Sequence, residues 1–194
     1  MKKIRIIVIV LLMFILSGCS GNYNLTFNED LSLKEELDIN IKNENNNYER
    51  TFYIFEKGNV DSDKYEIIAD DNNVYIKYTE NYDSFEDYLL NSNLYHMIFE
   101  NIDYSKDNKG MILNTESYLK LDDKGSNEIV NSYDIDNLKI NLKIPFSINK
   151  SNEDSKNNDV LTWELNKNYT YKEINIDFSY RKASTLSIIL IFLL

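Results

Sequence analysis

The sequence contains little cysteine, histidine and glycine. Cys19 is the only cysteine and His96 the only histidine among the 194 residues. One cysteine cannot form an intrachain disulfide or a Cys-rich zinc site, and one histidine excludes a His-rich metal site. The five glycines are scattered and form no glycine-rich phosphate loop. We therefore predict no catalytic residues, no metal and no cofactor, and we interpret His96 as a packed or surface residue.

The N-terminus has the pattern of an export signal. Basic residues occur at positions 2, 3 and 5, and Ile6 to Leu16 is an unbroken apolar run of eleven residues. A membrane span needs about 20 residues, so this run suits a signal peptide better. Leu16, Ser17 and Gly18 lead directly into Cys19, as in a lipoprotein processing motif. We predict a signal peptide over 1–18 and acylation of Cys19. The alternative is an uncleaved anchor with an incidental cysteine.

A diacylglyceryl group on Cys19 would hold the mature chain on the outer face of a cell membrane. Two acyl chains anchor a protein stably, whereas one binds weakly. We expect 19–22 to be a lipidated tether and 23–180 to be one folded domain. After acylation no free thiol remains to act as a nucleophile.

The C-terminal residues 181–194 form a second candidate anchor. Arg181 and Lys182 precede residues 186–194, nine almost purely apolar residues. At about 1.5 Å per residue this tail reaches ~14 Å, half of a ~30 Å hydrocarbon core. We interpret it as a truncated membrane helix or a segment that enters one leaflet. The alternative is a final core strand.

The chain is acidic. It has 32 acidic and 21 basic residues, and removal of 1–18 takes away three basic ones, leaving an excess of 14 acidic residues. Nucleic-acid binding needs a basic surface, so we expect no nucleic-acid partner. Electrostatic adhesion to anionic lipid is disfavoured for the same reason.

Most of the mature chain shows the alternation of half-buried strands. Hairpins are predicted around Glu29–Asp30, Asp70–Asn73, Asp122–Gly125 and Asn166–Asn168, and Leu138 to Ile144 alternates up to Pro145. In the second strand Leu31, Leu33, Leu37, Ile39 and Ile41 share one parity, and Glu35 is the polar exception. Ser84 caps a predicted helix, and a second is expected over Tyr48–Lys57. The predicted class is α+β: a mostly antiparallel, hairpin-rich sheet or partly closed barrel with one or two packed helices.

The order of these elements resembles the LppM-type lipoprotein domain family. The resemblance rests on the hairpin at Asn28-Glu29-Asp30, the helix start Ser84-Phe85-Glu86-Asp87, and Leu138 to Pro145 followed by a polar loop and Leu161-Thr162-Trp163-Glu164-Leu165. Relatives carry a glycine where this chain has Leu31, which weakens the case for a tight type I′ turn. The resemblance implies a lipid-anchored extracytoplasmic domain, often with a C-terminal membrane helix. In at least one branch it implies a link to envelope lipids or glycolipids.

The remaining candidates for chemistry are acidic clusters and aromatic residues. The clusters are Asp61/Asp63, Asp70/Asp71, Asp122/Asp123, Asp134/Asp136 and Glu153/Asp154/Asp159. None has the spacing of a calcium loop, and Asp favours turns, so we interpret them as solvated turns. Trp163 is expected in the core.

No ligand-binding residues follow from the sequence, and three hypotheses remain. The first is a binding module for an envelope lipid, glycolipid or partner protein. An apolar cavity would favour it. The second is a structural or assembly protein of the envelope, which a fully packed interior would favour. The third, an envelope hydrolase, needs two facing carboxylates in a cleft with raised pKa values.

Overall fold

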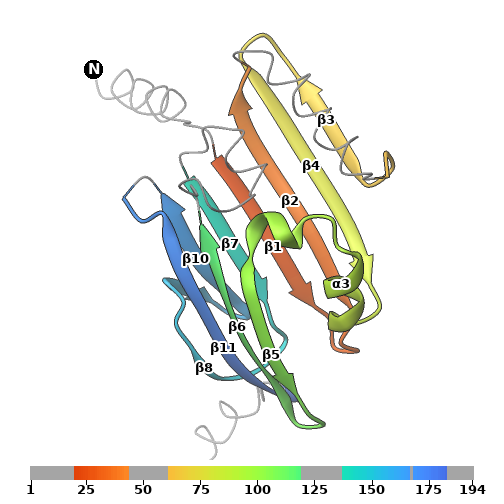
Figure 1. Cartoon of the computed structure of the whole chain (residues 1–194), viewed down its shortest axis with the longest axis vertical. Coiled ribbons are helices and arrows are strands. Elements are labelled where there is room, and N and C mark those ends of the chain that lie inside the picture. Colours follow the sequence, from red (N-terminus) through yellow and green to blue (C-terminus); the bar gives the residue numbers. More distant parts are fainter. Residues whose placement is uncertain (1–19, 44–60, 119–136, 167, 183–194) are drawn as a thin grey trace, which may run out of the picture.

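The computed structural model describes residues 20–43, 61–118, 137–166 and 168–182, without the side chains at 96–97, 118 and 181–182. These residues form two β-sheets that pack on each other (Figure 1). The described chain begins with β1 and ends with β11, and these two termini lie at opposite ends of the molecule.

Sheet A has seven strands in the order β3-β4-β2-β1-β7-β10-β9. All neighbours are antiparallel except β1 and β7, which are parallel. The strands are β1 (Ser20–Phe27), β2 (Leu33–Lys42), β3 (Tyr65–Ala69), β4 (Asn73–Tyr82), β7 (Asn137–Lys143), β9 (Ser155–Asn157) and β10 (Val160–Asn166). Because β1 begins at Ser20, residues 20–22 of the expected tether are paired in sheet A.

Sheet B has four antiparallel strands in the order β5-β6-β11-β8. They are β5 (Glu100–Lys106), β6 (Gly110–Tyr118), β8 (Phe146–Ser151) and β11 (Tyr171–Lys182). Two short helices, α3 (Phe85–Asn91) and α4 (Tyr95–Ile98), connect β4 of sheet A to β5 of sheet B.

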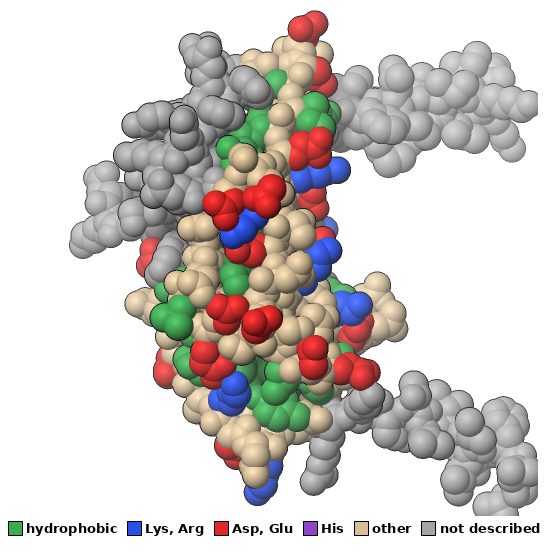
Figure 2. Space-filling view, turned by 90° about the vertical axis from the view of Figure 1, so that its right-hand side faces the viewer, with side chains coloured by type: hydrophobic (Ala, Val, Ile, Leu, Met, Phe, Trp, Pro, Cys, Tyr) green, Lys and Arg blue, Asp and Glu red, His purple; other side chains and the backbone are tan. Residues whose placement is uncertain are grey.

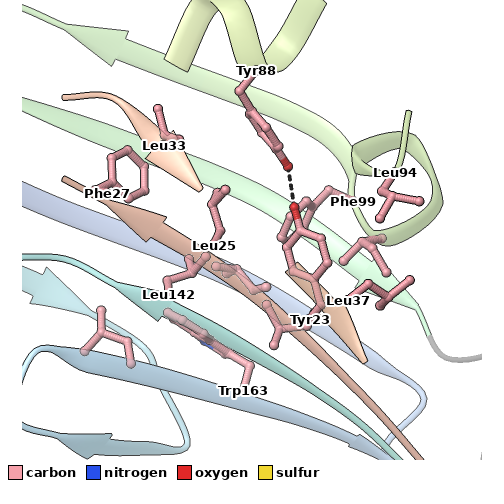
Figure 3. Close-up of a cluster of buried hydrophobic side chains, with 14 of the residues drawn as sticks. Tyr23, Leu25, Phe27, Leu33, Leu37, Tyr88, Leu94, Phe99, Leu142 and Trp163 are labelled. Atoms are coloured by element: carbon pink, nitrogen blue, oxygen red, sulfur yellow. Dashed lines mark hydrogen bonds between the residues drawn. The ribbon is translucent and has the colours of Figure 1, made fainter. Parts of the chain in front are cut away.

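The core lies between the sheets. Every second residue of β1, β2, β7 and β10 is buried, as is every second residue of β4 except Glu80, and the register places these residues on one face of sheet A. Phe178 of sheet B meets Phe27 edge-on at a ring-centroid distance of 5.5 Å. Leu25, Leu142 and Trp163 extend this layer, while Tyr88 reaches it from α3 (Figure 3). The alternation in the sequence therefore reflects strands that bury one face in the core between the two sheets and expose the other face.

The predicted α+β class is wrong, because the described part of the chain is mostly β. α3 has seven residues and α4 has four, so helix is a small share of the described chain. Within the described ranges both sheets are open, with β3, β9, β5 and β8 at their edges, so no barrel closes. The capping interaction was predicted correctly, since the Asp87 backbone N–H donates to Ser84 Oγ at 3.1 Å. The helix it starts ends after two turns because Ser92 adopts an extended backbone conformation (φ −66°, ψ 127°), and the chain continues through α4 into β5. The helix predicted over Tyr48–Lys57 lies outside the described residues.

The predicted hairpins met different outcomes. The β1–β2 and β3–β4 hairpins are confirmed by their registers. The last predicted hairpin is wrong, because β10 belongs to sheet A and β11 to sheet B. The chain reverses between them through backbone hydrogen bonds that join Asn166 and Tyr169. Alternation identifies a strand but not its partner, so it could not reveal that the chain passes from sheet A to sheet B between β10 and β11. The hairpin around Asp122–Gly125 lies outside the described residues.

The turn between β1 and β2 accommodates Leu31 in the left-handed region, at φ 68°. Leu31 N donates to Asn28 O, and Asn28 N donates to Ser32 O, which makes a wider turn than a two-residue type I′ loop. Asp30 Oδ1 accepts hydrogen bonds from both the N–H and the hydroxyl of Ser32. These bonds hold a conformation that costs a non-glycine residue about 1–2 kcal/mol.

Gly110 lies where β6 approaches β11 too closely for any side chain. A Cβ atom there would lie 2.2 Å from the Phe178 carbonyl oxygen. We expect Gly110→Ala to lower the free energy of unfolding by about 1–3 kcal/mol, as other overpacked sites do. Urea unfolding followed by Trp163 fluorescence measures the change.

Gly21→Ala is the matched control for this prediction. Its added Cβ would meet first the end of the Leu138 side chain, at 3.1 Å, which can move. A loss for Gly21→Ala as large as that for Gly110→Ala would contradict the backbone clash.

Candidate functional site

Two neighbouring depressions form a groove on the outer face of sheet B. Their volumes are about 290 and 490 Å³. Both are lined by Ile112 of β6 and Asp177 of β11, so they adjoin. We call this surface the sheet B groove.

The strand register explains which side chains face the groove. Ile174, Ile176 and Phe178 are buried, so Asn175 and Asp177 between them point outward. On β6 the same alternation turns Ile112 and Asn114 outward, opposite Asp177 and Asn175. On β8 a register irregularity at Asn149 separates the pairs Lys150–Asp177 and Ile148–Phe178. Such bulges redirect side chains and are frequent next to binding sites.

The larger depression is lined by four uncharged polar residues, by Ile112 and Ile176, and by the charged Lys150 and Asp177. Asn114, Ser151, Asn152 and Asn175 surround Ile112, which is 45% exposed. Asn152 is fixed in place, because its Oδ1 accepts hydrogen bonds from Trp163 Nε1 (3.1 Å) and from Asn175 N (2.9 Å). An apolar contact ringed by amides can recognise a neutral polyhydroxyl ligand.

The smaller depression is lined by the charged residues Lys106, Asp107, Lys109 and Asp177. Lys106 Nζ contacts both carboxylate oxygens of Glu86 at 2.9 Å, and this bond raises the pKa of Lys106 and lowers that of Glu86. Asp107 accepts hydrogen bonds from the N–H groups of Lys109 and Gly110, which lower its pKa. Lys106 is thus paired with Glu86 of α3, and Asp107 with backbone N–H groups of the β5–β6 turn, so we take the larger depression, which holds the amides, as the better ligand site.

A second cluster lies inside the core around Glu35. Tyr23 donates to Glu35 Oε1 at 2.7 Å, and Ser92 donates to both carboxyl oxygens at 3.0 and 2.8 Å. Tyr82 lies 2.7 Å from Glu35 Oε2, and Tyr88 lies 2.8 Å from Tyr23 (Figure 3). Burial, the largest effect, raises the pKa of Glu35, although the three hydroxyl hydrogen bonds act against it.

This cluster continues to the protein surface through Glu80. Glu80 accepts from Tyr78 and Lys64, and it lies 2.8 Å from the hydroxyl of Tyr82. Burial would raise the pKa of Glu80, but the hydrogen bonds from Lys64, Tyr78 and Tyr82 outweigh it and lower the pKa. A continuous polar path therefore joins the buried Glu35 to the partly exposed Lys64.

The space between the sheets is almost completely filled in the described part of the chain. The depression between Leu25, Phe99, Leu113 and Leu142 has a volume of about 10 Å³. An acyl chain needs far more room than this depression offers.

The residues singled out in the sequence have different outcomes. Leu16, Ser17, Gly18 and Cys19 lie outside the described residues, as do 186–194 and the clusters at 122–123 and 134–136. The side chain of His96 is also outside. Trp163 is fully buried, as predicted.

The acidic clusters that the structure describes lie at turns and ion pairs. Asp70 caps a turn by accepting from the N–H groups of Asn72 and Asn73, and Asp154 pairs with Lys172 at 2.6 Å. The described residues contain no group of three His, Cys, Asp or Glu side chains that could hold a metal ion. They also contain no helix with the length and hydropathy of a membrane span.

Sequence reasoning did not identify either candidate site. Glu35 broke the alternation of β2, and its position on the buried parity was a usable signal. The groove had no such signal, because it depends on the unpredicted pairing of β11 with β6 and β8.

Comparison with known proteins supports the fold. No family model matches the sequence, and neither does any curated protein. The chain is similar in structure to the folded domain of LppM from Mycobacterium tuberculosis, solved by NMR, with a TM-score of 0.53 and 14% identity. The match covers 85% of this chain and 91% of that domain. The protein therefore has a distant LppM-like fold, as the sequence motifs suggested.

Proposed function

We propose that this protein is a membrane-anchored extracytoplasmic lipoprotein that binds the neutral carbohydrate part of an envelope glycolipid, without catalysis. The observation that carries the proposal is the sheet B groove, where Asn114, Asn152 and Asn175 surround the exposed Ile112. The fold likeness to LppM and the processing motif ending at Cys19 support the lipoprotein part.

The charge of the chain favours a neutral ligand. Asp107 and Asp177 line the groove together with Lys106, Lys109 and Lys150, so its own charges nearly balance. The acidic excess belongs to the chain as a whole, and Figure 2 shows more acidic than basic side chains on the side of the molecule that it draws. This excess disfavours a strongly anionic ligand such as a polymer of phosphate groups. The filled core favours recognition of a headgroup over uptake of an acyl chain.

The hydrolase hypothesis finds no support in the Glu35–Glu80 pair. Glu35 is fully buried between the sheet and the helices and does not face a cleft. The filled core is also what a structural or assembly protein of the envelope would show, and this remains the second candidate function.

The test is a binding measurement on the full chain in detergent. A panel of neutral oligosaccharides that represent glycolipid headgroups identifies the best ligand, and calorimetry measures its affinity. We expect Ile112→Asp to weaken binding more than tenfold, or about 1.4 kcal/mol, because it replaces the apolar contact with a charge.

Ile68→Asp is the matched control. Ile68 lies on β3 of sheet A and is 50% exposed, close to the 45% of Ile112. Equal loss of binding in both variants, or a panel without any ligand, would reject the groove and leave the structural role.

A further inference from the structure

The hydroxyl of Tyr82 lies between two carboxyl groups. Its oxygen is 2.7 Å from Glu35 Oε2 and 2.8 Å from Glu80 Oε2. A phenol has one hydrogen, and ionised carboxylates only accept. With both carboxyls ionised, one of these two short contacts would therefore lack a hydrogen and be repulsive.

The other hydroxyl groups do not supply the missing hydrogen. Tyr23 and Ser92 use theirs on Glu35, and Tyr88 is placed to donate to Tyr23. Tyr78 contacts Glu80 Oε2 and is 3.4 Å from Tyr82. The cluster therefore needs one more proton than its hydroxyl groups provide.

The environment decides which carboxyl holds this proton. Glu80 contacts the ammonium group of Lys64, which favours its ionised form. Glu35 is fully buried, and its described partners are hydroxyl groups without charge. Burial of an unpaired carboxylate is costly, so the neutral form is preferred there.

We infer that Glu35 holds a proton at neutral pH and donates it to the Tyr82 hydroxyl, which in turn donates to Glu80. In this arrangement each short contact of the phenol groups has one hydrogen, and the Ser92 hydroxyl shares its hydrogen between the two Glu35 oxygens. Ser92 accepts from the N–H groups of Leu94 and Tyr95, so the neutral acid fastens the α3–α4 connection to β2. Loss of the proton would place an unpaired charge at this junction. The link that Glu35 makes between β2 and the α3–α4 connection therefore depends on pH.

The titratable and charged groups around Glu35 come from every element packed against it. They are Tyr23 of β1, Tyr78, Glu80 and Tyr82 of β4, Tyr88 of α3, Tyr95 of α4, and Lys64 with its partner Asp61 before β3. The pKa values of Tyr23, Tyr78, Tyr82 and Tyr88 are all raised, chiefly by burial, so these phenols stay protonated.

The sign of the pH dependence follows from the raised pKa of Glu35. Its stabilising contribution is complete below the unfolded pKa of ~4.3 and is lost as the pH rises through the folded pKa. Between these values the ratio of folded to unfolded protein falls about tenfold per pH unit from this one group.

The experiment compares the full chain with Glu35→Gln in urea unfolding from pH 5 to pH 8. The glutamine amide can accept from Tyr23 and donate to Tyr82, as the neutral acid does, so we expect the variant to fold and to lose the tenfold dependence per pH unit. At pH 7 it should be at least as stable as the natural chain. Lower stability at pH 7 with an unchanged pH dependence would overturn the proposal.

A second measurement does not depend on the folding of the variant. In the full chain labelled with ¹³C in its glutamate carboxyl groups, NMR reports the protonation of each side chain. We expect one buried glutamate to keep its protonated shift at pH 7, and Glu80→Gln to leave this signal in place. A spectrum in which every glutamate is ionised at pH 7 would overturn the proposal.

Discussion

Replacing Trp163 with alanine is expected to lower the free energy of unfolding by about 3–5 kcal/mol, the usual cost of removing a buried aromatic side chain. Trp163 is fully buried in β10, opposite Ile140 of β7, and lies beside Leu25 and Leu142 of the core (Figure 3). For a domain of this size the midpoint of thermal unfolding should fall by about 2–4 °C per kcal/mol. Circular dichroism measures it, because the variant has lost the only tryptophan.

The control is Trp163→Phe, which keeps a ring in the core but removes the indole N–H. Its loss should be smaller, because the cavity is smaller and only Asn152 Oδ1 loses one of its two donors. Equal losses in both variants would show that the hydrogen bond to Asn152, and not the filling of the core, determines the stability at this position.

Replacing Cys19 with alanine is expected to abolish the incorporation of labelled palmitate into the protein. The sulfur of Cys19 is the only thiol in the sequence, so no second site can take the thioether-linked group. Mass spectrometry should also find residues 1–18 retained in the variant, because it lacks the cysteine of the predicted processing motif. Ser20→Ala, one residue further on, is the control and should be labelled normally.

The opposite outcome is well defined. An unlabelled natural chain that keeps residues 1–18 would establish the uncleaved anchor instead.

The apolar residues 186–194 are tested separately, by exporting the domain behind a signal peptide that is not lipidated. Release of that chain into the soluble fraction without detergent would count against any membrane affinity of the tail.

The strands were the most predictable part of the structure. Alternation identified β1, β2, β4 and β7 because each buries one side against a single core and exposes the other. The fold class was misjudged because a capping signal at Ser84 marks where a helix begins but not how long it continues. The pairing of β11 with β6 could not be foreseen, since many strands of similar pattern were available as partners.

The two candidate sites differ in how far the sequence could reveal them. Glu35 was visible as a charged residue on a buried parity, but its partners Tyr23, Tyr82 and Ser92 come from three separate elements. The sheet B groove combines β6, β8 and β11 with a bulge at Asn149, which has no sequence signature of its own. Both sites depend on long-range register, which local patterns do not encode.

The start of β1 directly after Cys19 has a mechanical consequence. β1 is an interior strand of sheet A, and its first residue, Ser20, is paired with both Asn40 and Asn137. A force that pulls the domain away from the proposed anchor would act along β1 and load the hydrogen bonds to β2 and β7 together, in shear. An edge strand such as β3 or β9 would instead peel away one bond at a time. The proposed attachment point thus adjoins a strand that resists such a force through both of its neighbours at once.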